Sequence, residues 1–159
     1  DTILENNGTP LVTRVGHSFI KEAVIDSGAY FAGESSGHFM LNMTGEGCYE
    51  VPGIVALKLL AELSQAGISL SEYLKPFEKY FSSGEISLRV ENPQEKIALV
   101  KEQYSHGKIN ELDGLSVECP DLWFNLRASN TEALLRLNLE GISKEIVEKE
   151  TQNILSMIG

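Results

Sequence analysis

One short segment, Gly33-Glu-Ser-Ser-Gly-His38, carries more polar functional groups than a connection between two strands requires. Its two glycines allow left-handed backbone conformations, so a carboxylate, two hydroxyls and an imidazole can project from one turn. A sugar has several hydroxyls that need both donors and acceptors, and this set of side chains supplies both. The alternative is a solvated β-turn, for which glycine and serine are ordinary residues, and composition alone favours that alternative.

A second segment, Arg127-Ala-Ser-Asn-Thr-Glu132, has the donors that bind phosphate. Arg127 supplies a planar fork of N–H groups. Ser129, Asn130 and Thr131 add side-chain donors, and a tight turn can direct successive backbone N–H groups at one anion. The sequence contains no P-loop and no dinucleotide-binding fingerprint. An equally supported alternative is a polar loop in which Arg127 pairs with Glu132.

The remaining candidates are weaker. His17 follows Gly16 at the start of a predicted helix, where an imidazole can cap the helix or contact a ligand, but a lone histidine there is more often structural. Cys48 and Cys119 are accompanied by no CxxC spacing and no paired histidine, so we expect no metal site. Two cysteines in a chain of 159 residues do not form a disulfide framework, which indicates reduced thiols and a cytoplasmic protein.

The charge of the chain limits its partners. Thirteen Lys and Arg residues against 23 Asp and Glu residues give a net charge of −10. Such a surface repels nucleic acid and anionic lipid, and no basic stripe opposes this, so we expect no nucleic-acid or membrane partner. No apolar run approaches the ~20 residues of a membrane helix, and no signal peptide is visible.

The first half of the chain alternates short strands with helices, which predicts an α/β layer. The expected strands are 10–15, 29–32 and 38–43, and the expected helices are 17–26, 54–65 and 70–80, with a loop at 45–53. The helix at 54–65 is apolar almost all round, so we expect it to be buried. The order begins with part of a helix instead of a strand. We therefore expect residues 1–79 to be a partial α/β domain whose first strand is missing.

The second half, residues 80–159, has the order β-α-β-β-β-α and predicts an α+β domain. Its alternating segments predict a four-stranded antiparallel sheet with two helices on one face. The expected strands are 85–90, 115–119, 122–127 and 134–139. Asn92 and Ser143 are the predicted N-caps of the two helices.

Taken together, the two polar turns resemble those of the α-D-phosphohexomutase superfamily, in its phosphomannomutase/phosphoglucomutase branch. The resemblance covers essentially the whole chain. Thr13-Arg-Val-Gly-His-Ser-Phe-Ile-Lys-Glu22 and Gly33–His38 resemble the third, sugar-recognition domain of those enzymes. Three further segments resemble the fourth, phosphate-binding domain. They are Tyr80-Phe-Ser-Ser-Gly-Glu85, Leu112-Asp-Gly-Leu115 and Trp123-Phe-Asn-Leu-Arg-Ala-Ser-Asn-Thr-Glu132.

The resemblance also implies roles for individual residues. Glu34 and Ser36 would bind the ring hydroxyls of the sugar, with His38 beside them. His17 would line the same cleft and assist proton transfer. The phosphate at the end of the sugar that is not reacting would be gripped by Arg127, Ser129, Asn130 and Thr131.

For the intact enzyme, the resemblance implies interconversion of hexose 1-phosphate and hexose 6-phosphate, for glucose or mannose. The reaction would pass through hexose 1,6-bisphosphate and an enzyme phosphoserine, with Mg²⁺. This chain has no Ser flanked by His-Asn-Pro and no Asp-Gly-Asp run, so the nucleophile and the metal ligands are absent and we expect the chain alone to be inactive. Its first partner would be the missing N-terminal domains. The alternatives are a stand-alone phosphosugar-binding module and a truncated domain that self-associates through an unpaired sheet edge.

Overall fold

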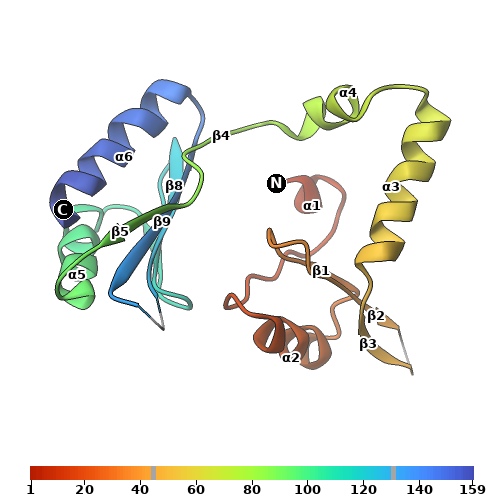
Figure 1. The fold of residues 1–159 in the computed structure, drawn as a ribbon, viewed down its shortest axis with the longest axis horizontal. Coiled ribbons are helices and arrows are strands. Elements are labelled where there is room, and N and C mark those ends of the chain that lie inside the picture. Colours follow the sequence, from red (N-terminus) through yellow and green to blue (C-terminus); the bar gives the residue numbers. More distant parts are fainter. Residues whose placement is uncertain (44–45, 130–131) are drawn as a thin grey trace. The chain divides into compact units, whose positions relative to one another are not determined.

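The computed structural model describes residues 1–43, 46–129 and 132–159, and it divides into two compact units, Asp1–Phe77 and Glu78–Gly159 (Figure 1). Each unit is described by itself. No single helix among the described residues is long and apolar enough to span a membrane. Pro52–Ala66 and Leu70–Phe77 reach that length and composition only as a pair, bent by 101°.

The elements follow one another in a simple order. The N-terminal unit contains α1 (Thr2–Glu5), α2 (His17–Ser27), β1 (Phe31–Gly33), β2 (Phe39–Met43), β3 (Gly47–Glu50), α3 (Pro52–Ala66), α4 (Leu70–Leu74) and the 3₁₀ turn η1 (Lys75–Phe77). The C-terminal unit contains β4 (Phe81–Ser82), β5 (Ile86–Arg89), α5 (Pro93–Gln103), β6 (Lys108–Asn110), β7 (Leu115–Glu118), β8 (Leu122–Ala128), β9 (Leu134–Gly141) and α6 (Lys144–Ile158).

A three-stranded antiparallel sheet, in the order β1-β2-β3, forms the centre of the N-terminal unit. Side chains alternate between the two faces of a strand, and Ala32 lies opposite Met40 in the register. Met40 and Cys48 are buried together with Ile20 and Val24, which lie one turn apart on α2. The helix α2 therefore packs on one face of the sheet and makes a small core with it.

The first unit differs from the alternating order that we expected. Its three strands follow one another as antiparallel hairpins, and β3 lies inside the segment 45–53 that we expected to be a loop; residues 44–45 lie outside the described residues. Pro10–Val15 is not a strand. Its apolar side chains are exposed, and no strand among the described residues pairs with it, so the backbone has no ladder to join.

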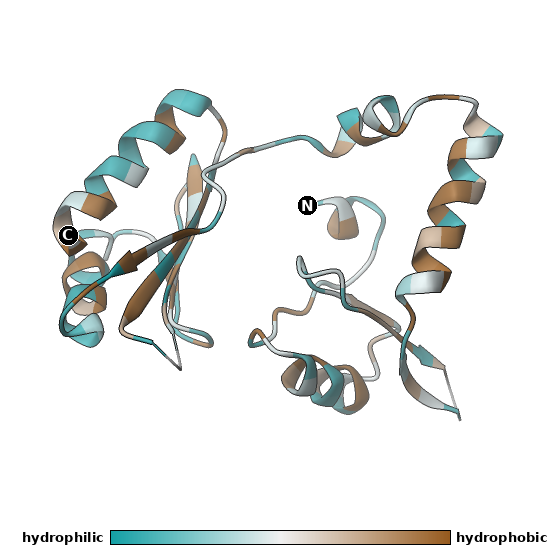
Figure 2. Ribbon diagram, in the orientation of Figure 1, coloured by the Kyte–Doolittle hydropathy of each residue, from teal (hydrophilic) through white to brown (hydrophobic). Residues whose placement is uncertain are grey.

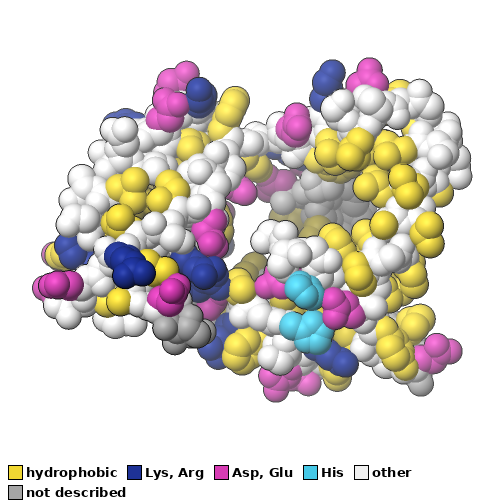
Figure 3. Space-filling view, viewed as in Figure 1, with side chains coloured by type: hydrophobic (Ala, Val, Ile, Leu, Met, Phe, Trp, Pro, Cys, Tyr) yellow, Lys and Arg dark blue, Asp and Glu magenta, His cyan; other side chains and the backbone are white. Residues whose placement is uncertain are grey.

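The helix α3 corrects a second expectation. None of its fifteen residues is buried, and Leu57 is 69% exposed, although we expected this apolar helix to be covered. The core of the unit consists of α2 and the sheet and does not extend to α3. In Figure 3, hydrophobic side chains lie at the surface along this helix.

The helix α4 is shorter than predicted, although it begins as expected. Ser69 and Glu72 form both hydrogen bonds of a capping box. The helix ends at Leu74 and continues only as the 3₁₀ turn η1. Pro76 contributes to this end, because proline has no N–H to donate to the next hydrogen bond of an α-helix.

The sheet of the C-terminal unit has six strands, and the four-stranded prediction is therefore wrong. The order is β4-β9-β8-β7-β6, with β5 also paired to β9, and every pair is antiparallel. The four predicted strands correspond to β5, β7, β8 and β9. The two additional strands, β4 and β6, have two and three residues and are too short to show alternation.

Both predicted helices of the C-terminal unit are present, and both pack on one face of its sheet (Figure 1). Buried side chains of the two helices meet the buried side chains of the strands in one core, made of Val90, Val100, Tyr104, Leu115, Val117, Phe124, Leu126, Leu135, Leu137, Leu139, Val147, Ile154 and Ile158. Figure 2 shows α6 with one hydrophobic stripe and one hydrophilic stripe, as expected for a helix packed on a sheet. Neither of these two helices covers the other face of the sheet, so polar side chains can lie there.

Candidate functional site

The segment that connects β1 to β2, residues 34–38, is a tight turn that brings three polar side chains together. The amide of Glu34 donates to the carbonyl of His38 at 2.9 Å, and the amide of Gly37 donates to the carbonyl of Glu34 at 2.9 Å. Gly37 has φ +89°, a left-handed conformation that other residues rarely adopt. The turn is thus a closed hairpin end, and Glu34, Ser36 and His38 project from it on neighbouring positions.

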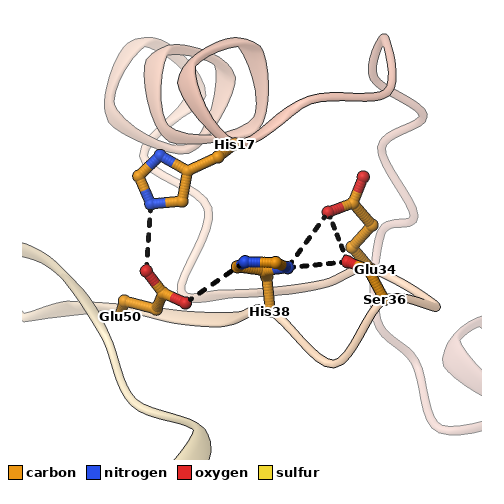
Figure 4. A network of polar contacts seen from close by, with 5 residues as sticks. All are labelled: His17, Glu34, Ser36, His38 and Glu50. Atoms are coloured by element: carbon orange, nitrogen blue, oxygen red, sulfur yellow. Dashed lines mark hydrogen bonds and ion pairs between the residues drawn. The ribbon is translucent and has the colours of Figure 1, made fainter.

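His17 joins this group from the helix α2. It is the first helical residue, after Gly16, and α2 packs on the face of the sheet that contains Met40. Because side chains alternate along a strand, His38 shares that face with Met40. Figure 4 shows the imidazoles of His17 and His38 on either side of the carboxylate of Glu50.

Glu50, the last residue of β3, connects the two histidines. Its Oε2 lies 3.1 Å from the Nε2 of His17, and its Oε1 lies 3.8 Å from the Nε2 of His38. The two imidazole rings are 6.0 Å apart between centroids, edge to face. One carboxylate therefore holds both rings at one end of the sheet.

The hydroxyl of Ser36 completes the network on the other side of His38. It donates to the Oε2 of Glu34 at 2.7 Å and lies 2.7 Å from the Nδ1 of His38. A hydroxyl has one proton, and a carboxylate can only accept, so the proton of Ser36 goes to Glu34. The Nδ1 of His38 then donates to Ser36. Ser36 thus fixes the orientation of the His38 ring on this side, while the Nε2 of His38 lies near Glu50 without a hydrogen bond.

The network is open to solvent along one side. The side chains of His17, His38 and Glu50 are 49%, 44% and 39% exposed, whereas that of Glu34 is only 15% exposed. In Figure 3, histidine side chains lie at the surface beside acidic side chains. A polyhydroxylated ligand that approaches this surface finds alternating donors and acceptors that are already oriented.

A second polar cluster lies in the C-terminal unit, around Arg127 near the end of β8. The Nη1 of Arg127 is 3.3 Å from the Oδ2 of Asp113, and the two side chains are 21% and 24% exposed. The amide of Asn125 donates to the carbonyl of Asp113 at 2.9 Å and to the hydroxyl of Ser116 at 3.0 Å. The turn before β7 is therefore fixed to β8, and its carboxylate orients the guanidinium.

This contact bears on the alternative in which Arg127 pairs with Glu132. Arg127 pairs with Asp113, and no contact between Arg127 and Glu132 is found among the described residues. The amide of Ser129 donates to the carbonyl of Leu134 at 2.8 Å, which closes the base of the loop between β8 and β9. Asn130 and Thr131, two of the predicted phosphate ligands, lie outside the described residues.

The structure thus brings together the four predicted residues His17, Glu34, Ser36 and His38 in the N-terminal unit, where Glu50 joins them. In the C-terminal unit, Asp113 joins the predicted residue Arg127. Sequence reasoning missed Glu50 because its segment was expected to be a loop. An acidic residue two positions before the helix-starting Pro52 was the available signal. Asp113 was part of a motif that resembled the family, but no charge partner could be assigned to it before the register of β7 and β8 was known.

Two observations on the part of the chain that the structure describes concern metal binding and the reactivity of one thiol. No group of three or more His, Cys, Asp or Glu residues there could hold a metal ion. A cavity of about 700 Å³ in the C-terminal unit is lined in part by Cys119, His106 and Glu150. Burial raises the pKa of the Cys119 thiol, and the carboxylates of Glu150 and Asp121 raise it further. Cys119 is therefore a protonated thiol at neutral pH and a weak nucleophile.

Comparison with known families finds a match for each of two parts of the chain. Residues 1–80 match the family described as phosphoglucomutase/phosphomannomutase, alpha/beta/alpha domain III. Residues 85–156 match the family described as phosphoglucomutase/phosphomannomutase, C-terminal domain. The chain belongs to the phosphoglucomutase/phosphomannomutase family.

Similar proteins support the same assignment. The chain is 39% identical over 158 residues to a phosphomannomutase of Methanocaldococcus jannaschii and 34% identical over 163 residues to a phosphomannomutase of Escherichia coli. In both comparisons 99% of this chain covers 35% of the relative. A crystal structure of a phosphoglucomutase/phosphomannomutase family protein from Burkholderia thailandensis aligns with a TM-score of 0.75 at 27% identity, over 96% of this chain and 33% of that one. The chain thus spans about a third of the length of these relatives.

Proposed function

We propose that this chain is the substrate-binding C-terminal part of a phosphomannomutase/phosphoglucomutase. The intact enzyme would interconvert hexose 1-phosphate and hexose 6-phosphate through a bisphosphate intermediate and an enzyme phosphoserine. The observation that carries the proposal is the network of His17, Glu50, His38, Ser36 and Glu34, which presents oriented donors and acceptors at an exposed surface.

In this proposal, the two clusters divide the recognition of one ligand. Glu34 and Ser36 bind the ring hydroxyls, and His38 is held beside them. Arg127 and Ser129, with Asn130 and Thr131, grip the phosphate that is not reacting. A substrate that must present each end in turn needs separate contacts for its ring and its phosphate, because each contact then holds the ligand in either orientation.

His17 has a distinct role in the proposal. Its Nε2 lies 3.1 Å from the Oε2 of Glu50, so this carboxyl group fixes the orientation of the imidazole. The imidazole can then donate to a ligand hydroxyl or assist the movement of a proton there. Glu50 acts through His17 and His38 and is a positioning residue.

The chain alone is proposed to be inactive as a mutase. Its sequence lacks the phosphoserine and magnesium motifs, and the described residues contain no group that fits Mg²⁺. We therefore assign the metal, the nucleophile and the bisphosphate chemistry to the missing N-terminal domains. Cys48 and Cys119 are free thiols, which suits a cytoplasmic enzyme.

Binding by the purified chain tests the proposal directly. Titration with glucose 1-phosphate or mannose 1-phosphate, followed by ¹H–¹⁵N NMR, should shift the amides of 33–38 and those near Arg127. Ser36→Ala should abolish the shifts at 33–38. Ser64→Ala is the matched control, because this serine lies on exposed α3, where its hydroxyl donates to the carbonyl of Leu60. The absence of shifts at both clusters would overturn the proposal.

An activity assay tests the second half of the proposal. The chain, supplied with Mg²⁺ and hexose 1,6-bisphosphate, should show no conversion of hexose 1-phosphate to hexose 6-phosphate. Addition of the separately produced N-terminal domains of a close relative is the positive arm. Turnover by the purified chain alone would contradict the assignment of the chemistry to those domains.

One observation favours a second candidate, a phosphosugar-binding or oligomerisation module without catalysis. Large apolar side chains are exposed on α3 and in the segment Pro10–Val15, among them Val12 at 72%. Such surface favours association with another protein surface. Sedimentation should show self-association or a tendency to aggregate, and a compact monomer at high concentration would count against this candidate.

A further inference from the structure

The polar face of the C-terminal sheet contains two arginines in direct opposition. Arg127 on β8 and Arg136 on β9 are partners in the register of the two strands. Their neighbours Leu126 and Leu137 are buried in the core under the helices, so both arginines project from the opposite face. Side chains directly opposite each other on one face of an antiparallel pair have Cβ atoms about 5 Å apart.

Two like charges in this arrangement repel each other, and the repulsion is relieved when an anion lies between them. The whole chain has a net charge of −10, so anions are attracted only where cationic groups are concentrated locally. The face adjoins the loop after Arg127, which already contains the proposed phosphate ligands. An oxyanion at this place would remove the repulsion and satisfy donors of both guanidiniums.

The two guanidiniums differ in how firmly the protein holds them. Arg127 contacts Asp113, and both side chains are largely buried. Arg136 contacts Glu85 through Nη1 at 3.3 Å, and these side chains are 37% and 44% exposed. Exposed ion pairs contribute little and exchange readily with other partners. Asp113 therefore orients Arg127, whereas Glu85 is a partner that a stronger anion can replace.

A further feature shows that the donors of Arg136 are not all satisfied. Its Nε is buried and has no hydrogen-bond partner among the described residues. Buried donors are nearly always paired in folded proteins, and an unpaired one favours any rearrangement that supplies an acceptor. A shift of the guanidinium away from Glu85 and toward a bound oxyanion is such a rearrangement.

We infer that Arg136 is a second phosphate-binding arginine, which binds a phosphate monoester together with Arg127 across the strands β8 and β9. The inference rests on the proposed function, because Arg127 is part of the phosphate site proposed above. It extends that site from the loop onto the face of the sheet. Glu85 competes with the phosphate for Arg136 and so limits the affinity.

The test measures affinity for inorganic phosphate and for glucose 1-phosphate by isothermal titration calorimetry, with the whole 159-residue chain. Arg136→Gln should weaken both affinities about tenfold, since it removes a charge-assisted bidentate contact. Arg136→Lys keeps the charge but loses the fork, and it should recover only part of the affinity. Arg89→Gln is the matched control, because Arg89 is an exposed arginine on the same face of the sheet, in the neighbouring strand β5. It should change the affinity less than about twofold.

Glu85→Gln tests the same inference without removing the arginine. It frees Arg136 from its competitor, so the affinity for phosphate should rise about two- to threefold. A variant that only damaged the fold would lower the affinity. Unchanged or weaker binding by Glu85→Gln therefore counts against the inference, even where Arg136→Gln folds poorly.

Two further outcomes of the binding experiment distinguish this inference from the proposed function. Phosphate binding that Arg127→Gln abolishes and Arg136→Gln leaves intact would overturn the role of Arg136 and leave the proposed phosphate site standing. Failure of the unmodified chain to bind either phosphate or glucose 1-phosphate would overturn the proposed site itself, and the inference with it.

Discussion

The Nε2 of His17 and the Oε2 of Glu50 lie 3.1 Å apart, although 33 positions separate the two residues in the sequence. One residue begins α2 and the other ends β3, so the contact forms only when the helix packs on the sheet. The same carboxylate reaches His38 with its other oxygen. The geometry of the proposed sugar site thus depends on a residue that contacts the histidines and not necessarily the ligand.

The variant Glu50→Gln tests this dependence. It keeps the shape of the side chain but replaces one acceptor oxygen by an amide donor, so one imidazole must turn or change its tautomer. We expect the affinity for glucose 1-phosphate to fall about tenfold, equivalent to about 1.4 kcal/mol, and the affinity for inorganic phosphate to stay unchanged. Calorimetry measures both affinities, and ¹⁵N NMR of the imidazoles should report a change at His17 or His38.

The control for this variant is Glu62→Gln, which makes the same change at an exposed position of α3. It should alter neither affinity nor the imidazole signals. Equal losses of affinity for phosphate and for glucose 1-phosphate in Glu50→Gln would indicate general damage to the fold. Unchanged binding of glucose 1-phosphate would show that Glu50 does not position the site.

The sequence predicted the polar turns better than it predicted the sheets around them. Glu34, Ser36 and His38 lie within one turn, so their proximity follows from local spacing alone. Glu50 could not be predicted in the same way, because its contact with His17 depends on the register of β2 and β3. Local patterns carry no information about that register until the strands are paired.

The strands show the same limit. β5, β7, β8 and β9 alternate over four or more residues and were found in the sequence, whereas β4 and β6 exist only because a neighbouring strand pairs with them. The edge beside β9 is interrupted at Gly84, whose φ is +68°, and the Oγ of Ser83 accepts a hydrogen bond from the amide of Leu139 at the break. The exposed helix α3 was predicted as a helix but not as exposed, since periodicity indicates which faces are apolar and not what covers them.

The backbone at Gly114 passes so close to Arg127 that there is no room for a side chain. It has φ +73°, and a Cβ added there would lie 2.6 Å from the carbonyl oxygen of Leu126 and 2.9 Å from the Cα of Arg127. Gly114→Ala should therefore destabilise the C-terminal unit by about 3–4 kcal/mol, from the backbone conformation and the clash together. Urea unfolding, followed by the fluorescence of Trp123, the single tryptophan of the chain, measures this change.

Gly84→Ala is the matched control for the clash. Its φ of +68° is nearly the same, but no atom lies within 4 Å of the added Cβ. It should cost only the strain of the left-handed conformation, about 1–2 kcal/mol. Similar losses for the two variants would show that the contact between Gly114 and β8 has no special weight.

The pair of Tyr104 and Glu150 makes the stability of the C-terminal unit depend on pH in two ranges. The hydroxyl of Tyr104 donates to the Oε2 of Glu150 at 2.7 Å. Burial raises the pKa of Tyr104, and the hydrogen bond and charge of Glu150 raise it further. Burial alone would raise the pKa of Glu150, but hydrogen bonds from Tyr104 and Asn153, with Lys149, outweigh it and lower that pKa.

The signs of the two effects differ. Glu150 is ionised in the folded state at lower pH than in the unfolded chain, so its contribution is complete above pH 4.5 and is lost as the pH falls below that value. Tyr104 stays protonated to higher pH when folded, so its contribution is complete below pH 10.0 and is lost as the pH rises above it. Unfolding free energies from urea titrations at several pH values should therefore fall at both ends of the range.

Tyr104→Phe should remove the part of the pH dependence of stability that comes from the hydroxyl of Tyr104. The variant should lose about 1.5 kcal/mol at neutral pH, because it removes a hydrogen bond to a charged group. Its unfolding free energy should then change less than that of the unmodified chain above pH 10.0. An undiminished loss of stability in that range would show that another group is responsible.

Thr151 on α6 offers a stabilising substitution. Its Oγ1 is buried and finds no hydrogen-bond partner in the part of the chain that the structure describes, and the residue is 9% exposed. Thr151→Val keeps the branched shape and removes the unsatisfied hydroxyl, so the free energy of unfolding should rise by about 1 kcal/mol.

Ser143→Ala, on the same helix, should change stability in the opposite direction by about 1 kcal/mol, because the Oγ of Ser143 accepts a hydrogen bond from the amide of Ile146 at the N-cap. Urea unfolding with Trp123 fluorescence compares the two variants under one set of conditions. A loss of stability in Thr151→Val would show that the hydroxyl is satisfied in solution, by water in the neighbouring cavity of about 460 Å³ that Thr151 lines.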